Sequence, residues 1–461
     1  MSDPSLLSRP NPLTPAQTAD AQRGGIPRAF GPAISALLAV SCALLSAACG
    51  VPEPPSSTGG VDPSAGECGR GLVVVSSDYQ SSNISLLDPY GDVLSSSFIS
   101  SASSSVGLSA PLSGDVVPPG SVVTGDQLVL LDRYPAAVIT WVDLSSARVT
   151  AQLNVGTGFN ANPHDYVEAG PQLAYISRFE PNPRPGRQAF DAGNDLLLVD
   201  PTGPSIIGRV DLTPAFTDSP EAYYPRADKL KLVGDSLYVL ASGYSADFQD
   251  SIESRLLRIN THSQLIEDVV LLSGLHGCGG LALAPSANQL AISCAGPFNS
   301  ELLLPYGSGI ALVDITGSPK LSRVILAGEV AEDAVAYAIT YASDRSLLFT
   351  TFGRFPSSGS ARMDGLYQLD LTSFESQRLL SSESLPFSFG DLRCEPACGY
   401  CFLADAARGG GVVHRFALEE PPTSSGEQPG AQRLGVVQLT LDRAIRPDTL
   451  IGLPPRYLGS Y

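Results

Sequence analysis

One recurring phrase constrains the fold more than any other feature: a run of apolar residues that ends at an acid, as in LLLVDP at 196–201. Close copies read ISLLDP, ITWVDL, IALVDI and LYQLDL, and weaker copies read LLRIN and VHRFAL. The last acids, or their equivalents, are Asp88, Asp143, Asp200, Asn260, Asp314, Asp370 and Ala417, with spacings of 55, 57, 60, 54, 56 and 47 residues. A period of this length carried by short strands is typical of a β-propeller.

Each repeat unit has the same order of elements: a strand, a polar turn, a second strand, the recurring strand and a fourth strand. In the fifth unit the strands read GGLALAP, QLAISC, GIALVDI and LSRVILAG. A strand packed between neighbouring blades needs apolar residues on both faces, which explains the recurring phrase. The acid after it opens the turn into the outer strand. We therefore expect an all-β fold, a seven-bladed β-propeller.

The first unit lacks its first strand, because GLVVVSSD already corresponds to a second strand. The segment RPDTLIGLP, which begins at Arg446, resembles the missing strand. We therefore expect the N- and C-terminal strands to share one blade, which would close the ring without an exposed sheet edge.

The N-terminal region has the parts of an export signal. Arg23 and Arg28 precede an uncharged segment that reads AISALLAVSCALLSAAC and ends at Cys49. LSAAC resembles the lipobox of bacterial lipoproteins, although Ser46 stands where that motif favours leucine. The following GVPEPPSSTGGVDPSAGE has the composition of a flexible tether. We predict a signal peptide at 1–48, a lipidated tether at 49–70 and a propeller at 71–461.

This organisation predicts an outer-membrane lipoprotein of the cell envelope, either periplasmic or surface-exposed, with Cys49 lipidated. Simple secretion after cleavage near Ala48 is the alternative. The formal net charge of −18, with only three lysines, disfavours nucleic-acid binding and binding to anionic lipid. We expect contact with a membrane only through the lipid anchor, and a monomer.

The strand pairs LAYISRF with LLLVDP, and SLYVLASG with LLRIN, resemble the YncE-like, or 40-residue YVTN, family of seven-bladed propellers. Within it, NPHDY followed by AYISRF, together with VGDSLYVL, resembles a group of bacterial surface lipoproteins of unknown role. The resemblance spans roughly residues 71–453. It implies the fold but no activity, because propellers host many unrelated functions.

Six cysteines remain after Cys42 in the signal and Cys49 are set aside, an even number that suits disulfides in an exported chain. The predicted pairs are Cys278 with Cys294, Cys394 with Cys401, and Cys68 with Cys398. The first two pairs flank hairpins, and the third would join the first and last blades. The alternative is a four-cysteine metal site built from Cys68, Cys394, Cys398 and Cys401.

Polar residues just before the first strand of each unit are expected to line the mouth of the central channel and to bind a ligand there. The candidates are Asn162, His164, Asp165, Tyr224, Arg226, Asp228, His276, Glu332, Asp333, Asp391, Arg446 and Asp448. The alternative is that these residues only shape the turns into the inner strands. His164 and Asp165 are adjacent on a strand and should point to opposite sides.

The chain contains no GxSxG, HExxH, P-loop or CxxCH motif, so we predict no catalytic residue and no cofactor. The preferred hypothesis is a non-enzymatic binding or scaffold module whose partner is a protein, a glycan or a small molecule. The alternative is a propeller enzyme, lactonase-like or dependent on a quinone or metal, with its site at the channel mouth.

Overall fold

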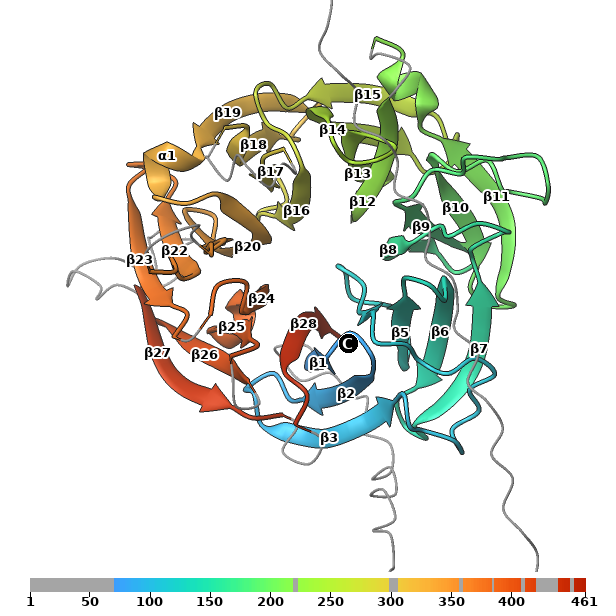
Figure 1. Ribbon diagram of the computed structural model, residues 1–461, viewed down its shortest axis with the longest axis horizontal. Helices are drawn as coiled ribbons and strands as arrows, with labels where there is room; N and C mark the ends of the chain where they lie inside the picture. Colours follow the sequence, from blue (N-terminus) through green and yellow to red (C-terminus); the bar gives the residue numbers. More distant parts are fainter. Residues whose placement is uncertain are drawn as a thin grey trace, which may run out of the picture. The chain divides into compact units, whose positions relative to one another are not determined.

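The computed structural model describes residues 70–461 except 219–222, 298–305, 356–359, 384, 408–410, 420–437 and 448–451. These residues form seven antiparallel sheets of four strands each, arranged in a ring around a common axis (Figure 1). The predicted seven-bladed β-propeller is therefore confirmed.

Each blade runs from an inner strand at the channel to an outer strand at the rim (Figure 1). The innermost strands are β28 (Pro455–Ser460), β4 (Val116–Val117), β8 (Pro163–Gly170), β12 (Tyr223–Val233), β16 (Cys278–Leu283), β20 (Val335–Ser343) and β24 (Phe389–Glu395). The second strands are β1 (Leu72–Ser77), β5 (Gln127–Asp132), β9 (Leu173–Arg178), β13 (Ser236–Ser245), β17 (Gln289–Ala295), β21 (Ser346–Thr351) and β25 (Tyr400–Asp405).

The third strands are β2 (Ser82–Leu87), β6 (Val138–Asp143), β10 (Asp195–Asp200), β14 (Ser251–Asn260), β18 (Ser308–Asp314), β22 (Gly365–Asp370) and β26 (Val412–Glu419). The outer strands are β3 (Val93–Ser100), β7 (Arg148–Asn154), β11 (Ser205–Asp211), β15 (Ile266–Leu271), β19 (Lys320–Leu326), β23 (Ser376–Ser381) and β27 (Gln438–Ile445). Short helical turns are α1 (Ala327–Val330), η1 (Thr213–Phe216) and η2 (Pro396–Cys398). No helix in the described ranges has the length and apolar character needed to cross a membrane.

The recurring phrase is the third strand of every blade, and its physical explanation holds. Five of the six residues of β6, β10 and β22 are buried, and all six residues of β2 are buried. The terminal acid then accepts backbone hydrogen bonds in the next turn: Asp200 Oδ1 accepts from Thr202 N at 2.9 Å, and Asp314 Oδ1 accepts from Thr316 N at 2.8 Å. Such a turn starts the connection to the outer strand.

The core is divided into seven hydrophobic clusters, one between each pair of neighbouring blades in the described part of the chain. The cluster between β1–β2 and β4–β6, for example, contains Val73, Ile84, Leu128 and Val142. Because each sheet is covered on both faces by its neighbours, the ring must be complete before every blade is fully buried.

The closing blade combines β28 with β1, β2 and β3, which confirms that strands from both ends of the chain share one sheet. The predicted location of the closing strand is wrong. Arg446 directly follows the outer strand β27, and the closing strand begins only at Pro455. In the sheet, Leu458 of β28 lies opposite Val74 of β1. The closing strand is therefore formed by residues 455–460 and not by the predicted segment that begins at Arg446.

Two predicted disulfides, Cys278–Cys294 and Cys394–Cys401, are confirmed. Each joins an inner strand to the second strand of the same blade, as the hairpin argument predicted. The proposed four-cysteine metal site is wrong, because Cys394 and Cys401 are bonded to each other and have no thiolate to offer a metal. Cys68 lies outside the described residues, so its pairing with Cys398 stays a prediction.

Candidate functional site

Two of the cavities formed by the described residues lie at the central channel, toward opposite ends. We call the first the mouth pocket; it lies where the inner strands begin and has a volume of about 440 Å³. Its lining includes Phe179, Asp228, Tyr244, Asp247, Phe248 and Tyr337. We call the second the lysine pocket; it lies where the inner strands end and has a volume of about 250 Å³. Its lining includes Asp165, Lys229, Lys231, Tyr337, Asp391 and Arg393.

The aromatic wall of the mouth pocket is built from loops and strand ends of adjacent blades. Phe179 follows β9, and Phe248 occupies the turn between β13 and β14 with a φ of 59°. The two rings are nearly parallel at a centroid distance of 6.3 Å. Tyr244 lies 5.4 Å from Phe248, and His164 stacks on Phe179 at 4.3 Å. Side chains from β8 and β13, from the residue after β9 and from the β13–β14 turn thus form one continuous aromatic surface.

Arg226 holds this aromatic surface in place. Its guanidinium carbon lies 3.7 Å from the centroid of Phe248 and 5.5 Å from that of Phe179. Arg226 is fully buried, and its charge is balanced by Glu180, whose Oε2 lies 2.5 Å from Nη1. A buried guanidinium against aromatic faces gains cation–π attraction and positions the rings. Arg226 is not part of the pocket lining, so its role is support.

Asp228 is one of two acids that line the mouth pocket. Its Oδ1 lies 2.9 Å from His164 Nδ1, and its backbone carbonyl accepts a hydrogen bond from Ser177 Oγ at 2.6 Å. Burial alone would raise the pKa of Asp228, but His164, Lys229 and Arg133 together hold it below its usual value. The carboxylate is therefore ionised at neutral pH.

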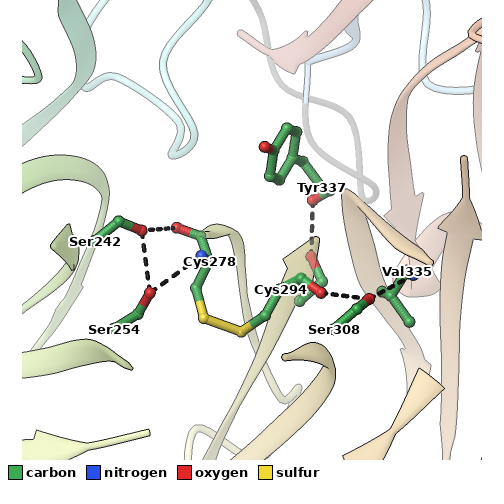
Figure 2. Close-up of a disulfide and its surroundings, with 8 residues drawn as sticks. Ser242, Ser254, Cys278, Cys294, Ser308, Val335 and Tyr337 are labelled. Carbon is green, nitrogen blue, oxygen red and sulfur yellow. Dashed lines mark hydrogen bonds between the residues drawn. A yellow bond between two sulfur atoms is a disulfide. The ribbon is translucent and has the colours of Figure 1, made fainter. Parts of the chain in front are cut away.

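A serine network links three blades around the pocket (Figure 2). Ser242 Oγ of β13 donates to the Cys278 carbonyl at 2.9 Å, and Ser308 Oγ donates to the Cys294 carbonyl at 2.9 Å. Ser308 Oγ also accepts from Val335 N of β20 at 2.9 Å (Figure 2). The disulfide therefore ties the blade that carries Tyr244 to the strand that carries Tyr337.

The lysine pocket is lined by basic and acidic side chains in equal number. Lys231 Nζ and Arg393 Nη1 both donate to the Gly120 carbonyl, the latter at 3.2 Å. Burial and the charge of Arg393 lower the pKa of Lys231 to about 8. Lys229 differs: burial disfavours its charge, but Asp165, Asp228 and Asp391 together raise its pKa. The channel thus has an acidic aromatic mouth and a charge-balanced opposite end.

Several predicted site residues do converge at the channel. His164 and Asp228 meet at the mouth pocket, as described above. Asp165 points the other way, as predicted, and is buried: it accepts from Gly120 N at 2.7 Å and from Leu230 N at 2.9 Å. It therefore ties three neighbouring blades together. Asn162 has a φ of 51°, and its buried Oδ1 has no hydrogen-bond partner in the described part of the chain.

The other predicted residues lie elsewhere. Tyr224 lies opposite Tyr244 in the β12–β13 pair, and His276 Nδ1 lies 3.1 Å from Ser251 Oγ. Burial lowers the pKa of His276. Asp333, two residues before the innermost strand β20, is paired with Arg362 at 3.2 Å, and Glu332 also contacts Arg362. Arg446 follows the outer strand β27, and Asp448 falls outside the described residues.

The sequence did not reveal the aromatic and basic residues of the channel: Phe179, Tyr244, Phe248, Tyr337, Lys229, Lys231 and Arg393. One signal was present. Two of the chain's three lysines, Lys229 and Lys231, stand two residues apart in one strand, and strand periodicity brings such residues to the same side. Among the described residues, no group of three or more His, Cys, Asp or Glu side chains could hold a metal ion.

Comparison with known proteins supports the fold alone. No family model and no curated protein matches the chain. Among solved structures, a putative 6-phosphogluconolactonase from Bacteroides fragilis matches with a TM-score of 0.52 and 11% identity, over 87% of this chain and 100% of that one. A protein from Lactobacillus plantarum matches with a TM-score of 0.52 and 11% identity, over 84% and 98%. Hydrazine synthase from Kuenenia stuttgartiensis matches with a TM-score of 0.47 and 13% identity, over 68% of this chain and 79% of that one.

Proposed function

We propose that the protein is an exported β-propeller that binds a small molecule in the mouth pocket without transforming it. The observation that carries this proposal is the pocket itself: four aromatic side chains and an ionised acid around about 440 Å³. Small-molecule sites are typically concave, mostly apolar and of this size, with a few polar groups that orient the ligand. Of the predicted partners, a small molecule fits a concave site of this volume better than a protein or a glycan.

The pocket is preformed, which favours binding. Arg226 fixes the rings of Phe179 and Phe248, and the Cys278–Cys294 disulfide sits beside Tyr244 and Tyr337 within the serine network. A ligand that enters a rigid site loses less free energy to the ordering of side chains. The site therefore offers a shaped surface before any ligand arrives.

Loss of the Phe248 ring will weaken ligand binding. A thermal-shift screen of a metabolite library identifies ligands, and calorimetry then compares wild type with Phe248→Leu. We expect the dissociation constant to rise about tenfold or more, because an aromatic contact of about 1 kcal/mol and the shape of the wall are both lost.

Phe374→Leu is the matched control. Phe374 has a φ of 61° and an arginine guanidinium carbon 3.6 Å over its ring, like Phe248, but it lies in the β22–β23 turn at the rim. Equal binding by both variants, or no ligand in the screen, would contradict the proposal.

Export and lipid anchoring complete the proposal. The signal-like segment that ends at Cys49 and the LSAAC motif support a lipoprotein of the outer membrane, and the resemblance to YncE-like surface lipoproteins agrees with it. The two disulfides support an oxidising compartment such as the periplasm or the cell surface.

Cys49→Ala will release the protein from the membrane fraction. In a Gram-negative host, wild type should incorporate labelled palmitate and sediment with membranes, whereas the variant should do neither, because its only proposed acylation site is gone. Cys42→Ala is the matched control and should remain labelled. If wild type carries no label, the anchor is ruled out and simple secretion remains.

A second candidate, a hydrolase, rests on one observation. His164 Nδ1 is held by Asp228 at 2.9 Å, which is the arrangement that orients an imidazole for proton transfer. Turnover of lactones or esters that disappears in His164→Gln would favour this candidate over pure binding.

A further inference from the structure

The charged side chains that line the mouth pocket are both acidic. Asp228 and Asp247 contribute carboxylates, and no lysine, arginine or histidine belongs to the lining formed by the described residues. Of the basic groups near the pocket, Arg226 is balanced by Glu180 behind the aromatic wall, and His164 Nδ1 lies 2.9 Å from Asp228 Oδ1. A positively charged ligand would therefore meet no like charge on the pocket wall.

The second oxygen of Asp228 is available. Oδ2 accepts no hydrogen bond from any residue in the described ranges, and the side chain is 14% exposed. Position 279 is a glycine, which leaves space beside this oxygen. A side chain there would place its Cβ 3.1 Å from Asp228 Oδ2 and 2.7 Å from Tyr337 Cδ1. A carboxylate oxygen held beside an aromatic ring can accept a charge-assisted hydrogen bond from a ligand.

The four aromatic rings provide the other half of a cation site. Phe179, Tyr244, Phe248 and Tyr337 surround the cavity, and the face of an aromatic ring attracts a cation within about 6 Å. Burial raises the pKa of Tyr244 to about 12, with Asp228 adding to the effect, so this phenol stays neutral at physiological pH. The wall is therefore apolar and neutral, with its negative charge concentrated at the carboxylates.

We infer that the ligand of the mouth pocket is an organic cation: an ammonium or guanidinium group carried on an apolar body. The cationic group lies at Asp228 Oδ2, and the apolar body packs against the rings. This inference rests on the proposed function, because it assumes that the mouth pocket binds a small molecule. Lys229 does not oppose it, since Lys229 lines the lysine pocket, where Asp165 and Asp391 also balance its charge.

The test compares ligands of different charge within each of two series of similar shape. Calorimetry with wild type compares phenethylamine, 2-phenylethanol and phenylacetate, and compares choline with its uncharged isostere 3,3-dimethylbutan-1-ol. We expect each cation to bind at least about tenfold more tightly than its neutral counterpart, and phenylacetate to bind most weakly, because desolvated cation–π contacts and the carboxylate both act only on positive charge.

Asp228→Asn then removes the charge while keeping a group that can accept from His164. The preference for amine over alcohol should fall several-fold, to the part that the aromatic rings and Asp247 still supply. Asp235→Asn is the matched control, because Asp235 also pairs with a histidine, His262 at 3.3 Å, but on the exposed surface. The wild-type series decides the question even if Asp228→Asn fails to fold.

The outcomes separate the two proposals. Equal binding of amine and alcohol, or tighter binding of phenylacetate, overturns the cation assignment and leaves a ligand-binding pocket. If neither this series nor the metabolite library contains a ligand, both the cation assignment and the proposed function fall.

Discussion

Deletion of residues 455–461 will abolish cooperative folding of the propeller. β28 supplies the innermost strand of the closing blade and pairs with β1 from Leu72 to Ser76. Leu458 is buried between the first and last blades, and Tyr461 is buried between the first and second. Without β28 the inner edge of β1 is unpaired and two of the seven interblade clusters are opened. Urea unfolding followed by circular dichroism should lose its single sharp transition.

A graded pair of substitutions makes this prediction more specific. Leu458→Ala removes a side chain that is 4% exposed in β28, and should lower the free energy of unfolding by about 2–5 kcal/mol. Leu441→Ala changes a side chain that is 46% exposed in the outer strand β27. This substitution should change the free energy of unfolding by no more than about 0.5 kcal/mol. A truncated protein that unfolds in the same single transition as wild type would show that the ring does not depend on β28.

Asp195→Asn will destabilise the protein by about 3–5 kcal/mol, because it leaves a buried arginine charge without its partner. Arg178 Nε lies 2.7 Å from Asp195 Oδ1, and Nη2 lies 2.7 Å from Oδ2. Both side chains are fully buried. The substitution keeps the size of the side chain, so no cavity contributes. The free energy of unfolding from urea titrations at neutral pH measures the effect.

Asp442→Asn is the matched control for this ion pair. Arg415 makes the same bidentate contact with Asp442: Nε lies 3.0 Å from Oδ1, and Nη2 lies 2.7 Å from Oδ2. The Asp442 side chain, however, is 30% exposed. Water screens exposed pairs, so the expected loss is at most about 1 kcal/mol. Similar losses in the two variants would mean that burial does not set the strength of the Arg178–Asp195 pair.

The order of strands within each blade was predictable because it depends on sequence patterns local to each repeat unit. The third strand of each blade must be apolar on both faces, and its terminal acid must accept hydrogen bonds in the next turn, as Asp200 and Asp314 do. These requirements recur at every unit, so a repeat of about 55 residues identified all seven blades. The two hairpin disulfides followed from the same local symmetry.

The closing strand was misplaced because its sequence carries little signal. PRYLGS alternates weakly between apolar and polar residues, and the earlier segment RPDTLIGLP fits a strand equally well on its own. Only the pairing with β1, where Leu458 lies opposite Val74, selects the later segment. That contact joins residues more than 380 positions apart, beyond the range of any local pattern.

By itself, the sequence determined the strand order, the number of blades and the two hairpin disulfides. It placed His164 and Asp228 just before their inner strands, whereas both lie within the inner strands β8 and β12. Only the tertiary structure decided that Phe179, Phe248 and Tyr337 enclose one pocket with Asp228, and that Lys229 and Lys231 face the opposite end. The reason is physical: hydrogen bonding between successive strands is a local property of each unit, whereas the lining of the channel depends on how all seven sheets turn toward a common axis.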